Sequence, residues 1–338
     1  MSRTLPEIDG RKVAAEAQLL RQVVGSCQPV VLRGLVSAWP AVHCATRSPQ
    51  DFQVYLEQFD RGLTTEIFVG EAAIDGRYYY TEDLKGFNFA RRRMAFREAL
   101  GAIAAGRATP DAPSLYLGSL TLHDFLPGFA QRNVLPALPP HILPRIWLGH
   151  AAKVSAHFDS YDNIACVVAG RRRFTLYPPE AISRLYVGPI DHTMAGQPVS
   201  LAVGSAPGDP RYPRFEEVRE QALVAELGPG DALYLPKLWW HQVESLSPFN
   251  ALVNYWWDAF AAGPDVPYAS LLLSLISIAE RPEPERRAWR AFFDHYVFRP
   301  EGHPLEHLPL EQHGLLGPLQ PDNYRRIRAW VMRLLRGE

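Results

Sequence analysis

Three side chains of this sequence could together hold a metal ion: His157, Asp159 and His241. His157 and Asp159 are two positions apart, and on an extended strand such side chains project to the same side. Two imidazoles and one carboxylate on one face of a metal leave its other face open, as in non-haem Fe(II) oxygenases. Zinc with a bound water would fit the same ligands and give a hydrolase. The triad therefore predicts a metal site without selecting the metal.

The segments around these residues have the patterns of antiparallel strands. An apolar run ending in glycine follows Asp159, and a second run closed by two prolines follows it, which together predict a hairpin behind the first ligand pair. Strands joined by a long insertion can place His241 opposite His157 and Asp159 inside a barrel. The strands expected in this region cover residues 163–170, 171–179, 232–236, 241–245 and 249–256.

The flanking segments supply further expected elements. Apolar spacing predicts helices over residues 14–24, 50–59 and 91–100, and strands over residues 30–34, 64–69, 113–120 and 145–149. The Pro- and Gly-rich segment 184–224 interrupts the strand pattern. Because so long a connection inside a compact domain usually covers or serves a site, we expect it to form a lid or a wall of the substrate cleft.

Composition limits the class of protein. The chain has 338 residues, 47% of them hydrophobic, which is enough for a large globular core. A formal net charge of -1 gives no sign of a nucleic-acid partner or an acidic membrane surface. Three cysteines without a pairing pattern favour a reducing cytoplasm, and the lack of a signal core or a long apolar run predicts a protein without a membrane segment.

Seven segments in a fixed order resemble a known family. From about residue 28 to 257 the chain is similar to the cupin-like JmjC hydroxylases, the Fe(II)- and 2-oxoglutarate-dependent group that includes the asparaginyl hydroxylase of hypoxia-inducible factor. The resemblance implies a mainly β fold with flanking helices (α+β), a double-stranded β-helix of the cupin/JmjC jelly-roll type. The matching segments are residues 28–40, 115–117, 157–163, 170–179, 230–236, 239–245 and 253–256.

The resemblance also assigns roles to single residues. It makes His157, Asp159 and His241 the metal ligands and catalytic centre. It implies co-substrate contacts for Tyr116, Asn163 and Asn254. Where the family usually has a lysine for the distal carboxylate of 2-oxoglutarate, this chain has Arg172, which keeps the charge and adds bidentate geometry.

Other positions depart from the family pattern, or have a second explanation. The family's threonine is replaced by Val154, and the neighbouring Ser155 could supply a hydroxyl only if the strand is locally bulged. The resemblance places Tyr79 and Tyr80 at the rim of the site, and Trp240 joins them as a candidate substrate contact. Packing on a half-buried strand explains the two tyrosines equally well.

The chain is expected to divide into a catalytic domain, residues 1–258, and a C-terminal helical region, residues 259–338. Apolar and amphipathic helices are predicted over residues 268–280, 283–297 and 323–335. In the resembled family such helices often form a homodimer interface. A helical cover on the same chain is the alternative.

The expected function is an Fe(II)/2-oxoglutarate-dependent dioxygenase that hydroxylates a C–H bond of a protein or peptide side chain. A small-molecule substrate remains open because the insertion could shape a closed site. Demethylation through hydroxylation uses the same residues. The alternative from another class is a non-catalytic cupin-like accessory protein that binds a metal or ligand, which Arg172 and Val154 favour and the intact triad opposes.

Overall fold

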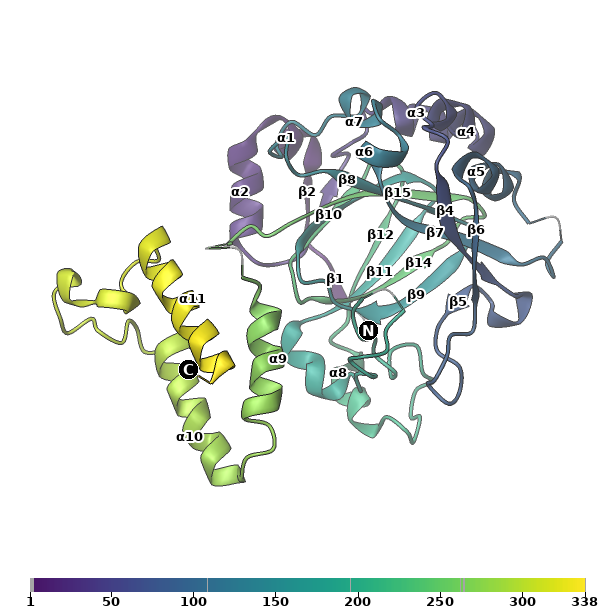
Figure 1. The fold of residues 1–338 in the computed structure, drawn as a ribbon. Helices are drawn as coiled ribbons and strands as arrows, with labels where there is room; N and C mark the ends of the chain where they lie inside the picture. Colours follow the sequence, from purple (N-terminus) through teal and green to yellow (C-terminus); the bar gives the residue numbers. More distant parts are fainter. Residues whose placement is uncertain (1–2, 108, 195, 262, 264, 338) are drawn as a thin grey trace. The chain divides into compact units, whose positions relative to one another are not determined.

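The computed structural model describes residues 3–107, 109–194, 196–261, 263 and 265–337. Contacts divide the chain into two units, residues 1–259 and residues 260–338. The first unit is built on β-strands and the second on helices (Figure 1).

Two β-sheets form the first unit (Figure 1). This confirms the predicted cupin-type jelly roll, and most neighbouring strands are antiparallel. The six-stranded sheet has the order β1 (Arg3–Thr4), β12 (Leu223–Leu227), β11 (Arg172–Tyr177), β14 (Trp240–Ser245), β9 (Ala152–His157) and β5 (Arg77–Tyr78). The nine-stranded sheet has the order β2 (Glu7–Asp9), β3 (Val30–Arg33), β13 (Ala232–Leu235), β10 (Asp162–Ala169), β15 (Asn250–Trp257), β8 (Pro144–Gly149), β7 (Ser114–Thr121), β4 (Thr64–Gly70) and β6 (Ala90–Ala95).

Strand β10 shows how the core is divided. All eight of its residues are buried, because both faces of the nine-stranded sheet are covered. Ile164 and Cys166 pack into the cluster that includes the helices, whereas Ala165 and Val167 pack against the six-stranded sheet. The strand thus joins two hydrophobic clusters through the alternation of its side chains.

Helices contribute to the larger of these clusters. Buried side chains of α2, α3, α4 and α5 pack with residues of the nine-stranded sheet. The helix predicted over residues 14–24 is two helices, because the backbone at Glu16 is extended. The helices of this unit outside the insertion are α1 (Gly10–Ala15), α2 (Ala17–Gly25), α3 (Pro40–Arg47), α4 (Pro49–Glu57), α5 (Phe96–Ala105), α6 (Leu122–Phe125) and α7 (Phe129–Arg132), with the short 3₁₀ turn η1 (Ala72–Ile74).

One helix prediction is wrong in its first half. Residues 90–95 are strand β6, paired in antiparallel register with β4 from Thr64 opposite Ala95 to Val69 opposite Ala90. Only from Phe96 does the chain form helix α5. Arginine is a good helix former, but pairing with the neighbouring strand outweighs this weak local preference.

The insertion is attached beside the predicted metal ligands. Its backbone forms an isolated bridge between Val199 and His157, and the N–H of Ser200 donates to the carbonyl of Ala156 at 2.7 Å. The Ser200 hydroxyl donates to the carbonyl of Leu185 within the insertion. The turn η2 (Pro179–Arg184) leads into the insertion. The insertion itself contains η3 (Pro213–Phe215) and α8 (Glu216–Arg219).

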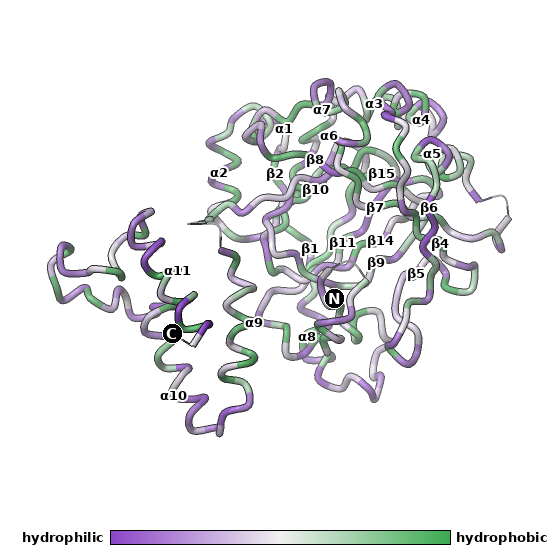
Figure 2. The backbone as a smooth tube through the Cα atoms, in the orientation of Figure 1, coloured by the Kyte–Doolittle hydropathy of each residue, from purple (hydrophilic) through white to green (hydrophobic). Residues whose placement is uncertain are grey.

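The second unit is helical, and its longer helices are amphipathic or apolar. Figure 2 shows hydrophobic residues along α9, whereas charged residues alternate with apolar ones in α11. Among the described residues, the helices are all too short or too polar to cross a membrane. The elements are α9 (Pro267–Ser277), α10 (Glu283–Phe293), the π-helix η4 (Asp294–Phe298), the 3₁₀ turns η5 (Leu310–Gln312) and η6 (Gly314–Leu316), and α11 (Pro321–Arg336).

Candidate active site

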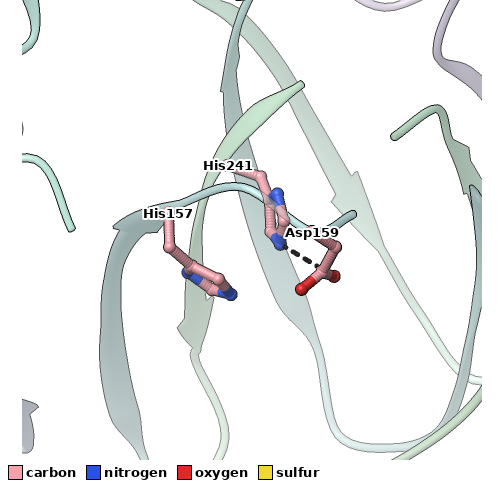
Figure 3. Close-up of side chains that lie close together, drawn as sticks. All are labelled: His157, Asp159 and His241. Atoms are coloured by element: carbon pink, nitrogen blue, oxygen red, sulfur yellow. Dashed lines mark ion pairs between the residues drawn. The ribbon is translucent and has the colours of Figure 1, made fainter. Parts of the chain in front are cut away.

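His157, Asp159 and His241 converge at the end of two paired strands (Figure 3). His157 is the last residue of β9 and lies opposite His241 on β14, with ring centroids 4.3 Å apart. Asp159 follows two residues after β9, and its carboxylate lies 3.7 Å from His241 Nε2. One candidate ligand atom from each residue lies within 4.8 Å of the others. This spacing suits a single ion held by three ligands.

A bulge in β9 sets this geometry. His157 pairs with His241 and Val154 with Val243, so β9 has two residues between these pairs where β14 has one. The additional residue lies at Ser155–Ala156. The local bulge that lets Ser155 take the place of the threonine of the resembled family is therefore present.

Hydrogen bonds fix both imidazole rings. His157 Nδ1 lies 2.8 Å from the carbonyl oxygen of Ser155, and His241 Nδ1 lies 3.0 Å from that of Trp239. A carbonyl only accepts, so both Nδ1 atoms carry the proton. Each Nε2 is left with a free lone pair, which is the form of histidine that binds metal ions.

The surroundings also keep His241 in the charge state that metal binding requires. Burial, and to a smaller extent His157, lowers the pKa of His241 to about 4, while Asp159 acts in the opposite direction. His241 is therefore neutral at physiological pH and available as a ligand. Trp256 donates its indole N–H to Asp159 Oδ2 at 3.2 Å, and the Asp159 carbonyl accepts from the N–H of Leu238.

The triad opens into a cavity of about 600 Å³ between the two sheets. A cavity of this size exceeds the needs of 2-oxoglutarate alone and falls in the range of ordinary ligand sites. Met194, Gln197 and Val199 of the insertion line it, which confirms the predicted cleft wall. Its aromatic lining consists of Phe68, Tyr78, Phe89, Tyr116, Trp147, Phe174 and Trp256.

Arg172 is the most unusual residue of the cavity. It lies on β11 with only 2% of its surface exposed, and its Nε and Nη2 atoms have no hydrogen-bond partner in the described structure. Tyr116, from β7 of the other sheet, interacts with the guanidinium and opposes the lowering of the Arg172 pKa by burial. A buried cation with unused donors is costly unless an anion binds it. The site therefore fits a carboxylate ligand.

Alternation along β11 separates Arg172 from its neighbours. Arg171 and Arg173 both pair with Glu226 on the opposite side, with closest N–O distances of 2.7 and 2.6 Å. Neither belongs to the residues that line the cavity. Of these three arginines, only Arg172 is placed to bind a ligand there.

Asn163 and Asn254 lie in the cavity wall and form one hydrogen-bonded chain. The indole N–H of Trp147 donates to Asn254 Oδ1 at 2.8 Å, and Asn254 Nδ2 donates to Asn163 Oδ1 at 3.2 Å. An indole only donates, which orients both amides. Asn163 is left with its NH₂ group as a donor for a ligand, while Asn254 mainly orients Asn163.

Ser155 is a further unpartnered polar group of the cavity. Its hydroxyl is buried, lines the cavity and has no hydrogen-bond partner among the described residues. A buried hydroxyl without a partner is unfavourable unless a ligand or water satisfies it. Together with Arg172 and Asn163 it supplies polar groups on an otherwise largely aromatic and aliphatic wall.

The three candidate substrate residues have other neighbours. Tyr79 stacks beneath the guanidinium of Arg77, and Tyr80 donates its hydroxyl to the carbonyl of His192. Trp240 is buried against Phe158. In the described structure, these three candidates are not part of the cavity lining, whereas the adjacent Tyr78 is.

Sequence reasoning did not identify Arg145 and Trp147 as site residues, although both line the cavity. They are two positions apart on β8, where the sequence predicts a strand over residues 145–149. The alternation of side chains along a strand was the available signal. It indicates a shared face but not which face borders the cavity.

Comparison with known proteins agrees with this geometry. A family model described as a cupin-like domain matches residues 16–263. The lysine-specific demethylase JMJ31 of Arabidopsis thaliana is 37% identical over 114 residues, which cover 33% of this chain and 20% of that protein. The bifunctional peptidase and (3S)-lysyl hydroxylase JMJD7 of Homo sapiens is 27% identical over 265 residues, which cover 68% of this chain and 77% of that protein.

A third relative is HSPB1-associated protein 1 of Homo sapiens, 32% identical over 149 residues. The match covers 43% of this chain and 30% of that protein. The chain thus spans a fifth of JMJ31 and under a third of HSPB1-associated protein 1.

Proposed function

Since the chain belongs to the cupin-like domain family, whose JmjC enzymes use Fe(II) and 2-oxoglutarate, we propose that it is a dioxygenase of this kind. The reaction would hydroxylate a C–H bond, most simply in a side chain of a protein or peptide. The observation that supports this is the buried, unpartnered guanidinium of Arg172 in the same cavity as His157, Asp159 and His241.

His157, Asp159 and His241 would hold the iron, each through the atom that the surrounding hydrogen bonds leave free. When bound, iron and 2-oxoglutarate supply the oxidising chemistry: one oxygen atom of O₂ enters the C–H bond, and the other enters succinate as carbon dioxide is lost. His241 would bind without first losing a proton, because burial lowers its pKa to about 4.

Arg172 and Tyr116 would bind the distal carboxylate of 2-oxoglutarate. A guanidinium offers two parallel N–H donors to a carboxylate, and Nε and Nη2 of Arg172 are the unused pair. Ser155 and Asn163 would donate to other oxygens of the co-substrate. The donors come from both sheets, so the co-substrate is oriented by a rigid frame rather than by loops.

The aromatic lining would keep water from the reacting centre. Trp147 and Trp256 pack edge to face with centroids 5.9 Å apart, and Trp147 also packs against Tyr116. Rings fixed in this way exclude water and strengthen the electrostatic interactions of the site. They also leave room for a substrate side chain next to the triad.

Turnover separates this function from the alternative, a non-catalytic accessory protein with the same pocket. The test is succinate formation from 2-oxoglutarate by the purified Fe(II) protein, with His157→Ala as the control. We expect succinate from the wild type and none from the variant. No iron-dependent succinate from the wild type, despite measurable metal binding, would favour the accessory protein.

We also propose that the second unit forms a homodimer. Large apolar side chains of its helices are exposed, including Leu271 and Ile276 of α9 and Leu334 of α11. Exposed apolar groups on several helices are more typical of an interface than of a solvent-facing surface. A second copy of the chain is a partner that is always available.

A reducing compartment such as the cytoplasm fits the state of the thiols. Cys27, Cys44 and Cys166 are all unpaired, and Cys27 is exposed. Exposed thiols persist where the surroundings are reducing. We therefore propose the cytoplasm as the site of action.

A further inference from the structure

The cavity has an excess of positive charge. Of the described residues that line it, three are arginines, Arg91, Arg145 and Arg172, and one is an acid, Asp159. The proposed iron would add two positive charges and 2-oxoglutarate two negative ones, which cancel. Three positive charges against one negative charge then leave a net charge of +2 around the space that remains for the substrate.

Arg145 is one of these three cations and lies on β8. Its Nε donates to Ser119 Oγ at 2.7 Å and its Nη2 to the Ser119 carbonyl at 3.2 Å. Among the described residues, Asp124 is the carboxylate that acts on this guanidinium, and it does so through a coulombic interaction without a hydrogen bond. Its Nη1 group is therefore available to an incoming anion.

The position of Arg145 relates it to the metal centre. Its guanidinium carbon lies 5.7 Å from the ring centroid of Trp256, and the same indole donates to Asp159. One aromatic ring thus separates the guanidinium from a proposed iron ligand. A group bound by Arg145 would hold the adjoining part of the substrate near the triad.

Arg91 adds a second cation at a more exposed place in the lining. Its Nη2 donates to the carbonyl of Met194 in the insertion, and the guanidinium lies 5.2 Å from the ring centroid of Phe68. Its ion pair with Glu66, at 3.5 Å, is half exposed and consequently weak. Arg91 can therefore attract an anion toward the cavity.

A cationic substrate does not suit this arrangement. A lysine, methyl-lysine or arginine side chain would have to leave water and enter a space with the same sign of charge. Two of the relatives have names that refer to lysine. The acidic residue among the described residues that line this cavity is Asp159, and Asp159 is needed to hold the metal.

We propose that the substrate carries a carboxylate that binds Arg145, with Arg91 aiding its entry. The substrate would be an acidic side chain of a peptide or a small carboxylic acid, and the hydroxylated carbon would lie between the carboxylate and the triad. This inference rests on the proposed function, because it takes the triad as the place of reaction. Pairing of the remaining Nη1 donors of Arg145 with a carboxylate supplies the specificity.

Binding can be measured without turnover. The full-length protein is loaded with Mn(II) and saturated with N-oxalylglycine, so that the Arg172 site is filled. The probes are three capped tripeptides, Gly-Xaa-Gly with glutamate, glutamine or lysine in the centre, and free N-acetylglutamate. The enhanced relaxation of probe protons by Mn(II) gives both a dissociation constant and proximity to the metal.

We expect the glutamate probe to bind at least about tenfold more tightly than the glutamine and lysine probes, as is typical of a charge-assisted contact. Arg145→Gln should remove this preference, and Arg145→Lys should retain most of it. Arg92→Gln is the matched control, because Arg92 is exposed on the same strand as Arg91 and outside the cavity lining.

Equal or tighter binding of the lysine probe, or an unchanged preference in Arg145→Gln, would overturn the inference. Binding of the tripeptide alone would identify a peptide substrate, and binding of N-acetylglutamate as well would identify a small acid; both support the carboxylate. N-oxalylglycine binding and succinate formation without a probe are measured on the same samples. Their absence would overturn the oxygenase proposal instead, so the two failures are distinguishable.

Discussion

Trp256 and Asp159 are joined by a hydrogen bond of 3.2 Å from the indole N–H to the carboxylate Oδ2. Trp256 lies on β15 of the nine-stranded sheet, and Asp159 follows β9 of the six-stranded sheet. Partners of this kind orient a metal ligand and limit its rotation. The contact therefore links the position of one sheet to the ligand geometry on the other.

Trp256→Phe should weaken metal binding about tenfold while the fold is kept. The substitution keeps an aromatic ring against Trp147 but removes the donor to Asp159, and loss of such a partner typically costs ten- to hundredfold in affinity. Mn(II) titration followed by electron paramagnetic resonance measures the effect. Trp257→Phe is the control, because Trp257 packs against the helix-side cluster. An unchanged Mn(II) affinity in Trp256→Phe would show that the hydrogen bond does not orient the ligand.

Arg172→Gln should raise the dissociation constant for 2-oxoglutarate by about tenfold to a few hundredfold, because it removes a charge-assisted, two-donor contact with a carboxylate. Arg172→Lys should restore much of the affinity by returning the charge. Calorimetric titration of the Mn(II) protein measures both. Arg173→Gln, which alters the arginine on the opposite side of the same strand, should bind 2-oxoglutarate as the wild type does.

Arg172→Met should stabilise the ligand-free protein, by roughly 1–2 kcal/mol in the free energy of unfolding. The wild type buries a cation whose Nε and Nη2 are unpartnered, and methionine fills similar space without that cost. Urea unfolding without metal or co-substrate gives the comparison. A variant less stable than the wild type would mean that the contact of Arg172 with Tyr116 outweighs the cost of burial.

Burial of neutral His241 should make the metal-free protein less stable in acid. Its pKa is about 4 in the fold and 6.5 in the unfolded chain, so between these values the unfolded state binds more protons. The contribution of His241 to the free energy of unfolding is fully present above about pH 6.5. It is lost as the pH falls toward 4, by about 1.4 kcal/mol per pH unit at most. Urea unfolding across this range should show a shallower pH dependence for His241→Gln. Parallel curves for the two proteins would contradict the assignment.

Ile276→Glu should weaken the proposed homodimer. Ile276 lies on α9 with 84% of its surface exposed, and a carboxylate there would have to be desolvated in an interface. Light scattering coupled to size exclusion measures the mass over a range of protein concentrations. Val54→Glu is a control on an exposed apolar residue of the first unit. A wild-type monomer at every concentration would exclude the dimer.

The ordered motifs predicted the jelly roll, and the alternation of side chains explains why Arg172 lies apart from Arg171 and Arg173, which pair with Glu226. Local preference is the only information within the Arg91–Arg93 segment, and it predicts a helix. Pairing with the edge of β4 determines the structure of this segment instead. Tyr79 and Tyr80 were favoured over Tyr78 by motif position. Which of three successive tyrosines points into the cavity depends on the pairing of β5 with β9.

The sequence by itself determined the chemical types at the site: two imidazoles, a carboxylate and a guanidinium at spacings that strands can bring together. Only the tertiary structure decided how these groups are used. The bulge at Ser155 arises from the register of β9 against β14, and the unpartnered state of Arg172 arises from what the facing sheet leaves unpaired. Register and burial are properties of pairs of distant segments, so a single strand does not contain them. The proposed role of Arg145 also depends on a distant segment, because the ring of Trp256 lies beside its guanidinium.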